Sequence, residues 1–304
     1  MRQRGSINRL HDSAFLLSSR WLVCHIWFVG AALLCLPLFA ACQAPTQYKS
    51  PPGYDLNKPQ KFVVSKSLHE ISGIALVNRI PDSLYAIEDE DGKLFKFHLG
   101  DGVFNHTKFG KKGDYEDVTI LKSEEVIVLR SDGSLFCFPL DKAHDKKVDS
   151  VKEYINILPQ GEYEGLYIDD DGKLYAMCKN CPVDSHHEVT VYILQKNAMA
   201  RWAITSQFQV SPDKKKLTSI NEKIRFHPSC LSKNPITHEW YIVSSVNKLL
   251  ITLDPKWNIT AYYSLDPVLF KQPEGLAFDR EGNMYISNEG VQGDGDVLLF
   301  NRIK

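Results

Sequence analysis

From about residue 60 onward, apolar and polar residues alternate along the chain. Runs such as "KLYAM", "NMYIS" and "EVIVL" show the two-residue period of half-buried β-strands, and helical periodicity is hard to find. Pairs of an acidic residue and glycine supply the tight turns that hairpins need, at Asp91-Gly92, Asp132-Gly133, Asp171-Gly172 and Glu281-Gly282. The pattern predicts an all-β domain.

The strand pattern recurs in five segments of the chain. The segments align when the following positions are taken as equivalent: Gly73, Asp117, Gly165, Cys230 and Gly275. Consecutive positions are then 44, 48, 65 and 45 residues apart. The long interval contains the inserted segment "SPDKKKLTSINEK". Three or four strands repeated every 45–50 residues or so are typical of a β-propeller blade. Residues 61–304 hold five such units, and six would require only about 40 residues each.

The two ends of this region complement each other. The last unit provides strands at "GLAFD", "MYIS" and "VLLFNR" but lacks a fourth, whereas "KFVVSKSL" at 61–68 precedes the first unit without a partner. Pairing of the N-terminal strand with the last blade closes the ring and removes an exposed sheet edge. We therefore predict a five-bladed β-propeller closed by an N-terminal strand.

The N-terminus has a different composition. Four arginines precede the apolar run "WLVCHIWFVGAALLCLPLFAAC", as in secretory signals. The run ends in "FAAC", which resembles the lipobox of bacterial lipoproteins, in which the cysteine, here Cys42, is lipidated and becomes the mature N-terminus. An ordinary signal or a transmembrane anchor is the alternative, because the run is long enough to span a bilayer.

These features divide the chain into three parts. Residues 1–41 are a signal peptide or anchor, residues 42–60 are a Pro-rich polar tether, and residues 61–304 form the propeller. We expect a bacterial envelope protein tethered to the membrane. No acidic run of the kind linked with surface export follows Cys42, so we place the domain in the periplasm. The net charge of −1 gives no reason to expect a nucleic-acid partner, and we expect a monomer.

Repeated carboxylates suggest where the chemistry lies. In a four-stranded antiparallel blade, the start of the first strand and the end of the second lie at the same face. Residues just before each first strand should converge on the axis at one mouth of the propeller: Ser72, Glu116, Glu164, Ser229 and Glu274. Residues around the second-strand ends should surround that mouth, including Asp89, Glu90, Asn288 and Glu289, with Glu70 and His227 close by.

Several carboxylates on one axis repel each other unless a cation compensates them. Ca²⁺ suits such a site because it accepts many oxygen ligands in a flexible geometry. We therefore predict calcium bound by Glu116, Glu164 and Glu274. The alternative is a structural network in which Arg130 or Lys179 neutralises the glutamates.

Other chemical motifs are sparse. "CKNC" at 178–181 has the spacing of a local disulfide, a redox pair or half a zinc site. No nucleophile elbow, phosphate-binding loop or HExxH zinc motif occurs in the sequence.

Segments across nearly all of residues 61–304 resemble the SdiA-regulated family of bacterial envelope proteins, which is distantly similar to NHL-repeat propellers. The resemblance rests on "HEISGIAL", "YEGLYIDDDGKLYAMCKN", "RFHPSCLSKNP", "YIVSSVNKLLITLD" and "KQPEGLAFDREGNMYISNEG". It implies a five-bladed propeller with bound calcium and no settled activity. Through the matching motifs "YED", "YEG" and "PEG", the resemblance implies that Glu116, Glu164 and Glu274 are the calcium ligands. The first and fourth blades have Ser72 and Ser229 at the equivalent positions, so the five blades are not equivalent there.

Two functions remain open at this point. The first is a calcium-stabilised binding module that presents the propeller mouth to an envelope protein or a small ligand, because no nucleophile–base pair is evident. The second is a calcium-dependent hydrolase, a lactonase or phosphoesterase, in which His69 or His227 transfers protons.

Overall fold

The computed structural model describes residues 47–122, 124–185, 187–213, 215, 225–290 and 293–304, and Thr46–Lys304 form one compact unit. The apolar N-terminal run and Cys42 lie outside the described residues. None of the helices within the described ranges is long and apolar enough to cross a membrane.

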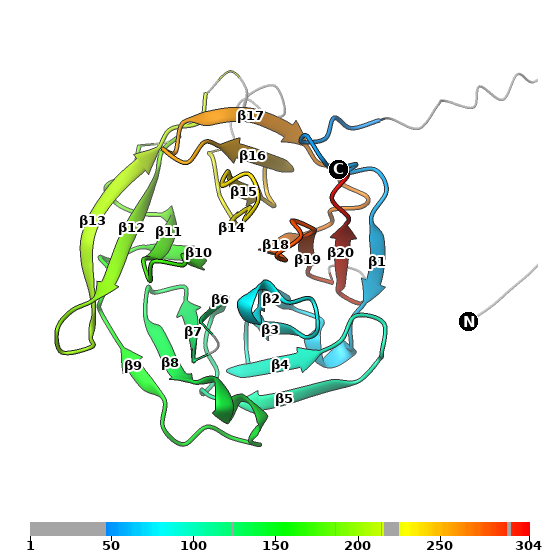
Figure 1. Ribbon diagram of the computed structural model, residues 1–304. Helices are drawn as coiled ribbons and strands as arrows, with labels where there is room; N and C mark the ends of the chain where they lie inside the picture. Colours follow the sequence, from blue (N-terminus) through cyan, green and yellow to red (C-terminus); the bar gives the residue numbers. More distant parts are fainter. Residues whose placement is uncertain (1–46, 123, 186, 214, 216–224, 291–292) are drawn as a thin grey trace, which may run out of the picture. The chain divides into compact units, whose positions relative to one another are not determined.

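Five four-stranded antiparallel sheets surround a common axis (Figure 1), which confirms the predicted five-bladed propeller. In the first blade the strands are β2 (Ile71–Leu76), β3 (Leu84–Glu88), β4 (Lys93–Phe97) and β5 (Phe104–Lys108). The second contains β6 (Tyr115–Leu121), β7 (Glu125–Arg130), β8 (Leu135–Pro139) and β9 (Lys152–Tyr154). The third contains β10 (Glu162–Ile168), β11 (Leu174–Asn180), β12 (Val189–Lys196) and β13 (Trp202–Val210).

The fourth blade consists of β14 (Cys230–Lys233), β15 (Trp240–Ser244), β16 (Leu249–Leu253) and β17 (Ile259–Ser264). The fifth combines β18 (Pro273–Phe278), β19 (Met284–Asn288) and β20 (Asp296–Phe300) with β1 (Gln60–Val63) from the other end of the chain. Because β1 pairs antiparallel with β20, the N-terminal strand closes the ring as predicted. Three short 3₁₀ helices, η1 (Lys66–Leu68), η2 (Val77–Arg79) and η3 (Leu140–His144), connect strands.

The innermost strands approach each other very closely around the axis. A Cβ on Gly73 would lie 2.2 Å from Oδ1 of Asp117 in the next blade, and one on Gly275 would lie 2.6 Å from the carbonyl oxygen of Ser72. Only glycine leaves room for such contacts. The buried Asp117 carboxylate accepts hydrogen bonds from the N–H of Val118 at 2.8 Å and from that of Leu166 at 2.7 Å. Through the Leu166 bond, it joins the second blade to the third.

Part of the segment that we expected to be a tether packs against the propeller. Tyr54 and Leu56 are 6% and 1% exposed and belong to the core between the fourth and fifth blades. The Tyr54 hydroxyl donates to the carbonyl of Gly282 at 2.5 Å and accepts from Asn234 Nδ2 at 2.8 Å. The packed unit therefore extends to before residue 61.

Candidate metal centre and its acidic mouth

The three predicted glutamates share an unusual backbone position. In the second blade, Tyr115 pairs with Arg130 and Asp117 with Leu129, so Glu116 is an extra residue between two consecutive pairs. The same register shift brackets Glu164 in the third blade and Glu274 in the fifth. Each glutamate is thus the extra residue of a β-bulge, a feature that re-aims a side chain and often lies next to a functional site.

The structure brings Glu116 and Glu164 together at the axis. Burial, followed by the negative charges of Glu164 and Asp114, raises the pKa of Glu116 to about 10. The pKa of Glu164 is also raised, mainly by burial, although hydrogen bonds from Lys179 and Glu116 lower it. The two carboxyl groups therefore hydrogen bond to each other and hold protons more tightly than they would in water, as expected when like charges share a buried site.

Glu274 completes the group from the fifth blade. Burial and then the charge of Glu164 raise the pKa of Glu274 to about 7, while a hydrogen bond from the Ser229 hydroxyl lowers it. Ser229, the corresponding residue of the fourth blade, also accepts a hydrogen bond from the N–H of Ser245 at 3.2 Å. In the first blade Ser72 is buried, and its carbonyl accepts from the Ser287 hydroxyl at 2.7 Å.

Lys179 supplies positive charge at the axis. Its ammonium group donates a hydrogen bond to Glu164, and the two side chains are 32% and 7% exposed. The other basic residue considered from the sequence, Arg130, turns away and binds Asp132 of its own hairpin turn at 2.6 Å. Lys179 therefore faces all three glutamates, and Lys248 lies near enough to Glu274 for the charge of that glutamate to oppose the lowering of the Lys248 pKa by burial.

A second acidic group lies on the side of the mouth that the first and fifth blades form. Carboxylate oxygens of Glu70, Glu88 and Asp89 lie within 4.8 Å of one another. Burial, Glu70 and Glu289 raise the pKa of Asp89 to about 7, and its buried Oδ1 has no hydrogen-bond partner among the described residues. Glu88, which the sequence pattern did not single out, accepts from the N–H groups of Glu90 and Asp91 at 3.2 and 2.7 Å and so caps the hairpin turn.

The remaining mouth residues have distinct surroundings. Glu289 accepts a hydrogen bond from the Gln272 amide, and its pKa is raised by burial and by Glu70. Glu90 lies farther out, 57% exposed and 3.3 Å from Lys112. Asn288 turns into the sheet, where its Nδ2 donates to Asp296 Oδ1 at 2.8 Å.

His227 lies near Lys179. Its pKa is lowered by burial and then by the charges of Lys179 and Arg225, and its buried Nδ1 has no hydrogen-bond partner among the described residues. Its N–H donates to Asn247 Oδ1 at 3.1 Å, and its carbonyl accepts from the Ser244 hydroxyl at 2.5 Å. The imidazole is therefore held by its backbone while one ring nitrogen stays unused.

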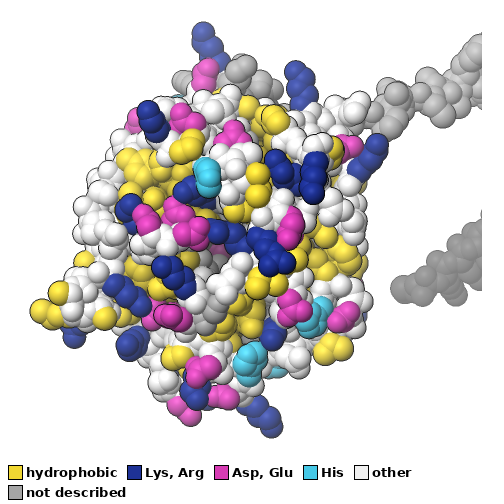
Figure 2. Space-filling view, in the orientation of Figure 1, with side chains coloured by type: hydrophobic (Ala, Val, Ile, Leu, Met, Phe, Trp, Pro, Cys, Tyr) yellow, Lys and Arg dark blue, Asp and Glu magenta, His cyan; other side chains and the backbone are white. Residues whose placement is uncertain are grey.

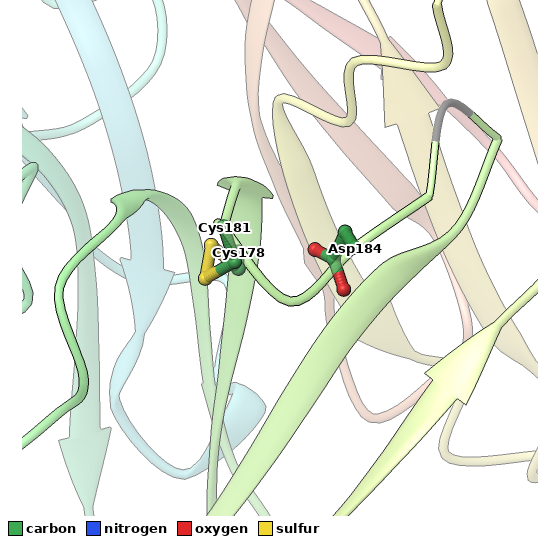
Figure 3. A group of neighbouring side chains, drawn as sticks. All are labelled: Cys178, Cys181 and Asp184. Carbon is green, nitrogen blue, oxygen red and sulfur yellow. A yellow bond between two sulfur atoms is a disulfide. The ribbon is translucent and has the colours of Figure 1, made fainter.

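The two cysteines of "CKNC" form a disulfide (Figure 3). Cys178 and Cys181 are 0% and 2% exposed, so the sulfur atoms are shielded from solvent. The bridge closes a four-residue loop that contains Lys179 and Asn180, and Asn180 Oδ1 accepts from Arg225 at 3.0 Å. Of the alternatives left open by the spacing, the structure contains the local disulfide, and we assign it the role of fixing the loop that carries Lys179.

The donor atoms of this mouth match a hard divalent cation in their chemistry. The carboxylates of Glu116, Glu164 and Glu274 and the Ser229 hydroxyl are all oxygen ligands, which Ca²⁺ prefers. The three glutamates do not bring their carboxylate oxygens within 4.8 Å of one another, as Glu70, Glu88 and Asp89 do, so the side chains would have to move closer together to share one ion. Burial is the main cause of the raised pKa values of the three glutamates and repulsion between the carboxylates is the second for Glu116 and Glu274, and a bound cation would offset both effects. The Lys179 ammonium group already binds Glu164 and would compete with a metal for that carboxylate.

Comparisons with known proteins agree with this architecture. A family model described as SdiA-regulated matches residues 50–291. A solved luciferin-regenerating enzyme is similar at 10% identity and a TM-score of 0.51, covering 81% of this chain and 96% of that one. A streptogramin B lyase structure matches at 8% identity and 0.47, covering 81% and 87%. The WD40 propeller domain of Doa1 matches at 9% identity and 0.47, covering 81% and 96%. At this low identity, the likeness to the luciferin-regenerating enzyme shows the fold alone, and no curated protein matches the chain.

Proposed function

The chain belongs to the SdiA-regulated family, and from this premise we propose that it is an exported calcium-binding propeller that acts as a binding module in the bacterial envelope. The observation that carries the proposal is the convergence of three bulge glutamates at one mouth, with Lys179 among them and Lys248 near Glu274. Such excess buried charge favours a bound divalent cation. Glu116, Glu164 and Glu274 would hold the calcium, which neutralises them and fixes the mouth.

The recognition surface in this proposal is the mouth itself. Its ring of hairpin ends is held by fixed strands, which suits the recognition of an envelope protein or a small ligand. Figure 2 shows one face of the propeller, on which basic and acidic side chains are interspersed. We further propose that the protein is a monomer, that lipid on Cys42 tethers it to the membrane, and that the propeller lies in the periplasm.

The test is thermal unfolding of the full-length protein, purified in mild detergent, in Ca²⁺ and in EGTA. A ligand that binds only the native state stabilises it by RT ln(1 + [L]/Kd), about 2.7 kcal/mol at a hundredfold excess over Kd. For a domain of this size, that corresponds to a Tm increase of about 5–10 °C. Glu274→Gln should reduce this response, whereas Glu281→Gln should preserve it, because Glu281 pairs with Arg280 in an exposed turn. If the protein, after removal of bound metal, has the same Tm in calcium and in EGTA, the metal site is refuted.

His227 favours a second candidate, a calcium-dependent hydrolase acting on a lactone or a phosphate ester. An imidazole whose pKa is lowered and whose buried nitrogen has no partner among the described residues has the properties of a general base. Turnover of a lactone or phosphoester panel that requires metal and is lost in His227→Ala would establish the enzyme. Capture of one defined envelope partner without turnover would establish the binding module.

A further inference from the structure

The five innermost strands enclose a narrow space along the axis, which we call the central channel. A pocket of about 270 Å³ lies at the end of this channel opposite the acidic mouth, and we call it the far pocket. It is lined by the C-terminal halves of the innermost strands β2, β6, β10, β14 and β18 and by residues of the turns that follow the first three. The glutamates lie at the start of these strands, so the far pocket is separate from the acidic mouth. A volume of this size is below the usual range of about 300–1,000 Å³ for drug-sized ligands, and it suits a smaller molecule.

Arg79 reaches across this end of the channel from the first blade to the third. Its guanidinium donates to the Tyr167 hydroxyl at 3.1 Å and to Asp170 Oδ2 at 3.1 Å. The Arg79 side chain is 26% exposed, whereas that of Asp170 is 78% exposed. Because so exposed an ion pair is worth little, the carboxylate of a ligand could replace Asp170 with little loss of free energy. Arginine is well suited to this exchange, since its planar group binds carboxylates in a bidentate manner.

The other side chains of the far pocket leave an excess of positive charge. Lys233 pairs with Asp169 at 2.6 Å. Lys122 is exposed at the rim and forms no salt bridge within the described residues. Three basic side chains therefore face two carboxylates, while the strand residues in the wall, such as Ile74, Val118 and Leu276, are mostly apolar.

The backbone that carries Arg79 adopts an uncommon conformation. Asn78 and Arg79 have φ angles of 51° and 55°, and Lys122 at the same rim has 41°. The carbonyl of Arg79 accepts from the N–H of Arg280 at 2.9 Å, which fixes the turn against the fifth blade. Left-handed conformations of non-glycine residues cost about 1–3 kcal/mol and cluster at functional sites. Here they hold one guanidinium over the end of the channel.

From these observations we propose that the far pocket binds a small organic acid. The carboxylate of the ligand takes the place of Asp170 on Arg79 and remains within reach of Lys122, and a short apolar chain extends into the channel. This site is independent of the proposed calcium site, and its occupant differs in charge.

Binding of butyrate to the full-length protein in detergent and EGTA, measured by isothermal titration calorimetry, tests the proposal. Butyrate should bind, whereas butylammonium, of similar shape and opposite charge, should not. Arg79→Gln should weaken butyrate binding at least fivefold. Asp170→Asn should strengthen it, because the competing carboxylate is gone. Arg280→Gln is the matched control, since that side chain pairs with Glu281 at 2.9 Å on the same face and should leave the affinity unchanged.

Three outcomes overturn the proposal. The first is absence of butyrate binding at 10 mM or so in both the wild type and Asp170→Asn. Because Asp170→Asn alters only an exposed side chain, this result is decisive even if Arg79→Gln fails to fold. The second is equal weakening by Arg79→Gln and Arg280→Gln, which indicates general electrostatic attraction. The third is inorganic phosphate binding as tightly as butyrate, which assigns the pocket to bare anions and removes the apolar chain from the argument.

Discussion

Replacement of Lys179 by methionine tests how the axial glutamates are compensated. The substitution keeps most of the apolar stem and removes the ammonium group that hydrogen bonds to Glu164. The positive charge of Lys179 lowers the pKa values of Glu116, Glu164 and Glu274, so its loss removes the cation that acts on all three, while Lys248 remains near Glu274. We expect the variant to be less stable than wild type in EGTA.

The exposure of the two partners sets the size of the effect. Breaking a fully buried ion pair by removing one partner costs about 3–5 kcal/mol. Glu164 is nearly buried at 7% exposure, but Lys179 is 32% exposed, so water already screens part of the attraction. We therefore expect a loss of about 2–3 kcal/mol, since the pair is only partly buried. In a domain of this size that loss lowers Tm by about 5–10 °C.

Calcium should affect the variant more than the wild type. Without the competing ammonium group, Glu164 becomes available to the cation, so the increase in Tm between EGTA and Ca²⁺ should be larger in Lys179→Met. Circular dichroism melts at pH 7.5 in the two buffers measure both effects. The control is Lys173→Met in the same blade, because Lys173 pairs with Asp171 in an exposed turn at 2.6 Å. If Lys179→Met melts as wild type does in EGTA, the lysine does not compensate the glutamates and this reasoning fails.

Two further predictions concern stability. In EGTA, Asp89→Asn should stabilise the protein more at pH 8 than at pH 5, and hardly at all at pH 3.5, as measured by the pH dependence of Tm. The folded-state pKa of Asp89 is about 7, above the ordinary value of 3.8, so the carboxyl group begins to destabilise the fold as the pH rises above 3.8 and does so fully once the pH exceeds about 7. After allowance for solvent screening we expect on the order of 1 kcal/mol at pH 8. Tyr54→Phe should lower the free energy of unfolding in urea by about 1–3 kcal/mol, because the Gly282 carbonyl and the Asn234 amide lose a buried hydrogen-bond partner; an unchanged midpoint would contradict this role of the N-terminal segment.

The repeat made the fold predictable from the sequence, because strand alternation and acidic–glycine turns are local signals that reflect burial and turn geometry. The packing of Tyr54 was not predictable in the same way. Its surroundings, "QAPTQYKSPPGYDLNKPQ", are polar and Pro-rich, and the groove that buries it is built from Tyr241 and Phe278 of distant strands. Composition alone therefore favoured a free tether.

The β-bulges likewise could not be predicted from the alternation of apolar and polar residues. A period of two assigns each residue to a face only while the strand register is continuous, and the register shifts at each of the axial glutamates. The sequence placed Glu116, Glu164 and Glu274 next to strands of known direction. Only the backbone shows that they are the extra residues that turn toward a shared axis.

The register also explains why Lys179, and not Arg130, compensates the glutamates. Arg130 pairs with Tyr115, and the matching residues of the third and fifth blades are Cys178 and Asn288, which pair with Tyr163 and Pro273. Lys179 and Glu289 each come one residue after this paired position. Lys179 is also the extra residue of a second register shift, between the pairs Glu162–Asn180 and Tyr163–Cys178, and such a bulge re-aims its side chain toward the mouth, whereas Arg130 binds Asp132 of its own hairpin.

This correspondence divides the mouth into two halves of different charge. The third blade contributes Glu164 together with Lys179, so its carboxylate is paired. The fifth blade contributes Glu274 together with Glu289, and the adjoining first blade adds Asp89; none of these three forms a salt bridge within the described part of the chain. Uncompensated charge therefore accumulates where the fifth and first blades meet. A divalent cation relieves the most repulsion on that side, away from Lys179, so we expect Glu274→Gln to weaken calcium binding more than Glu164→Gln.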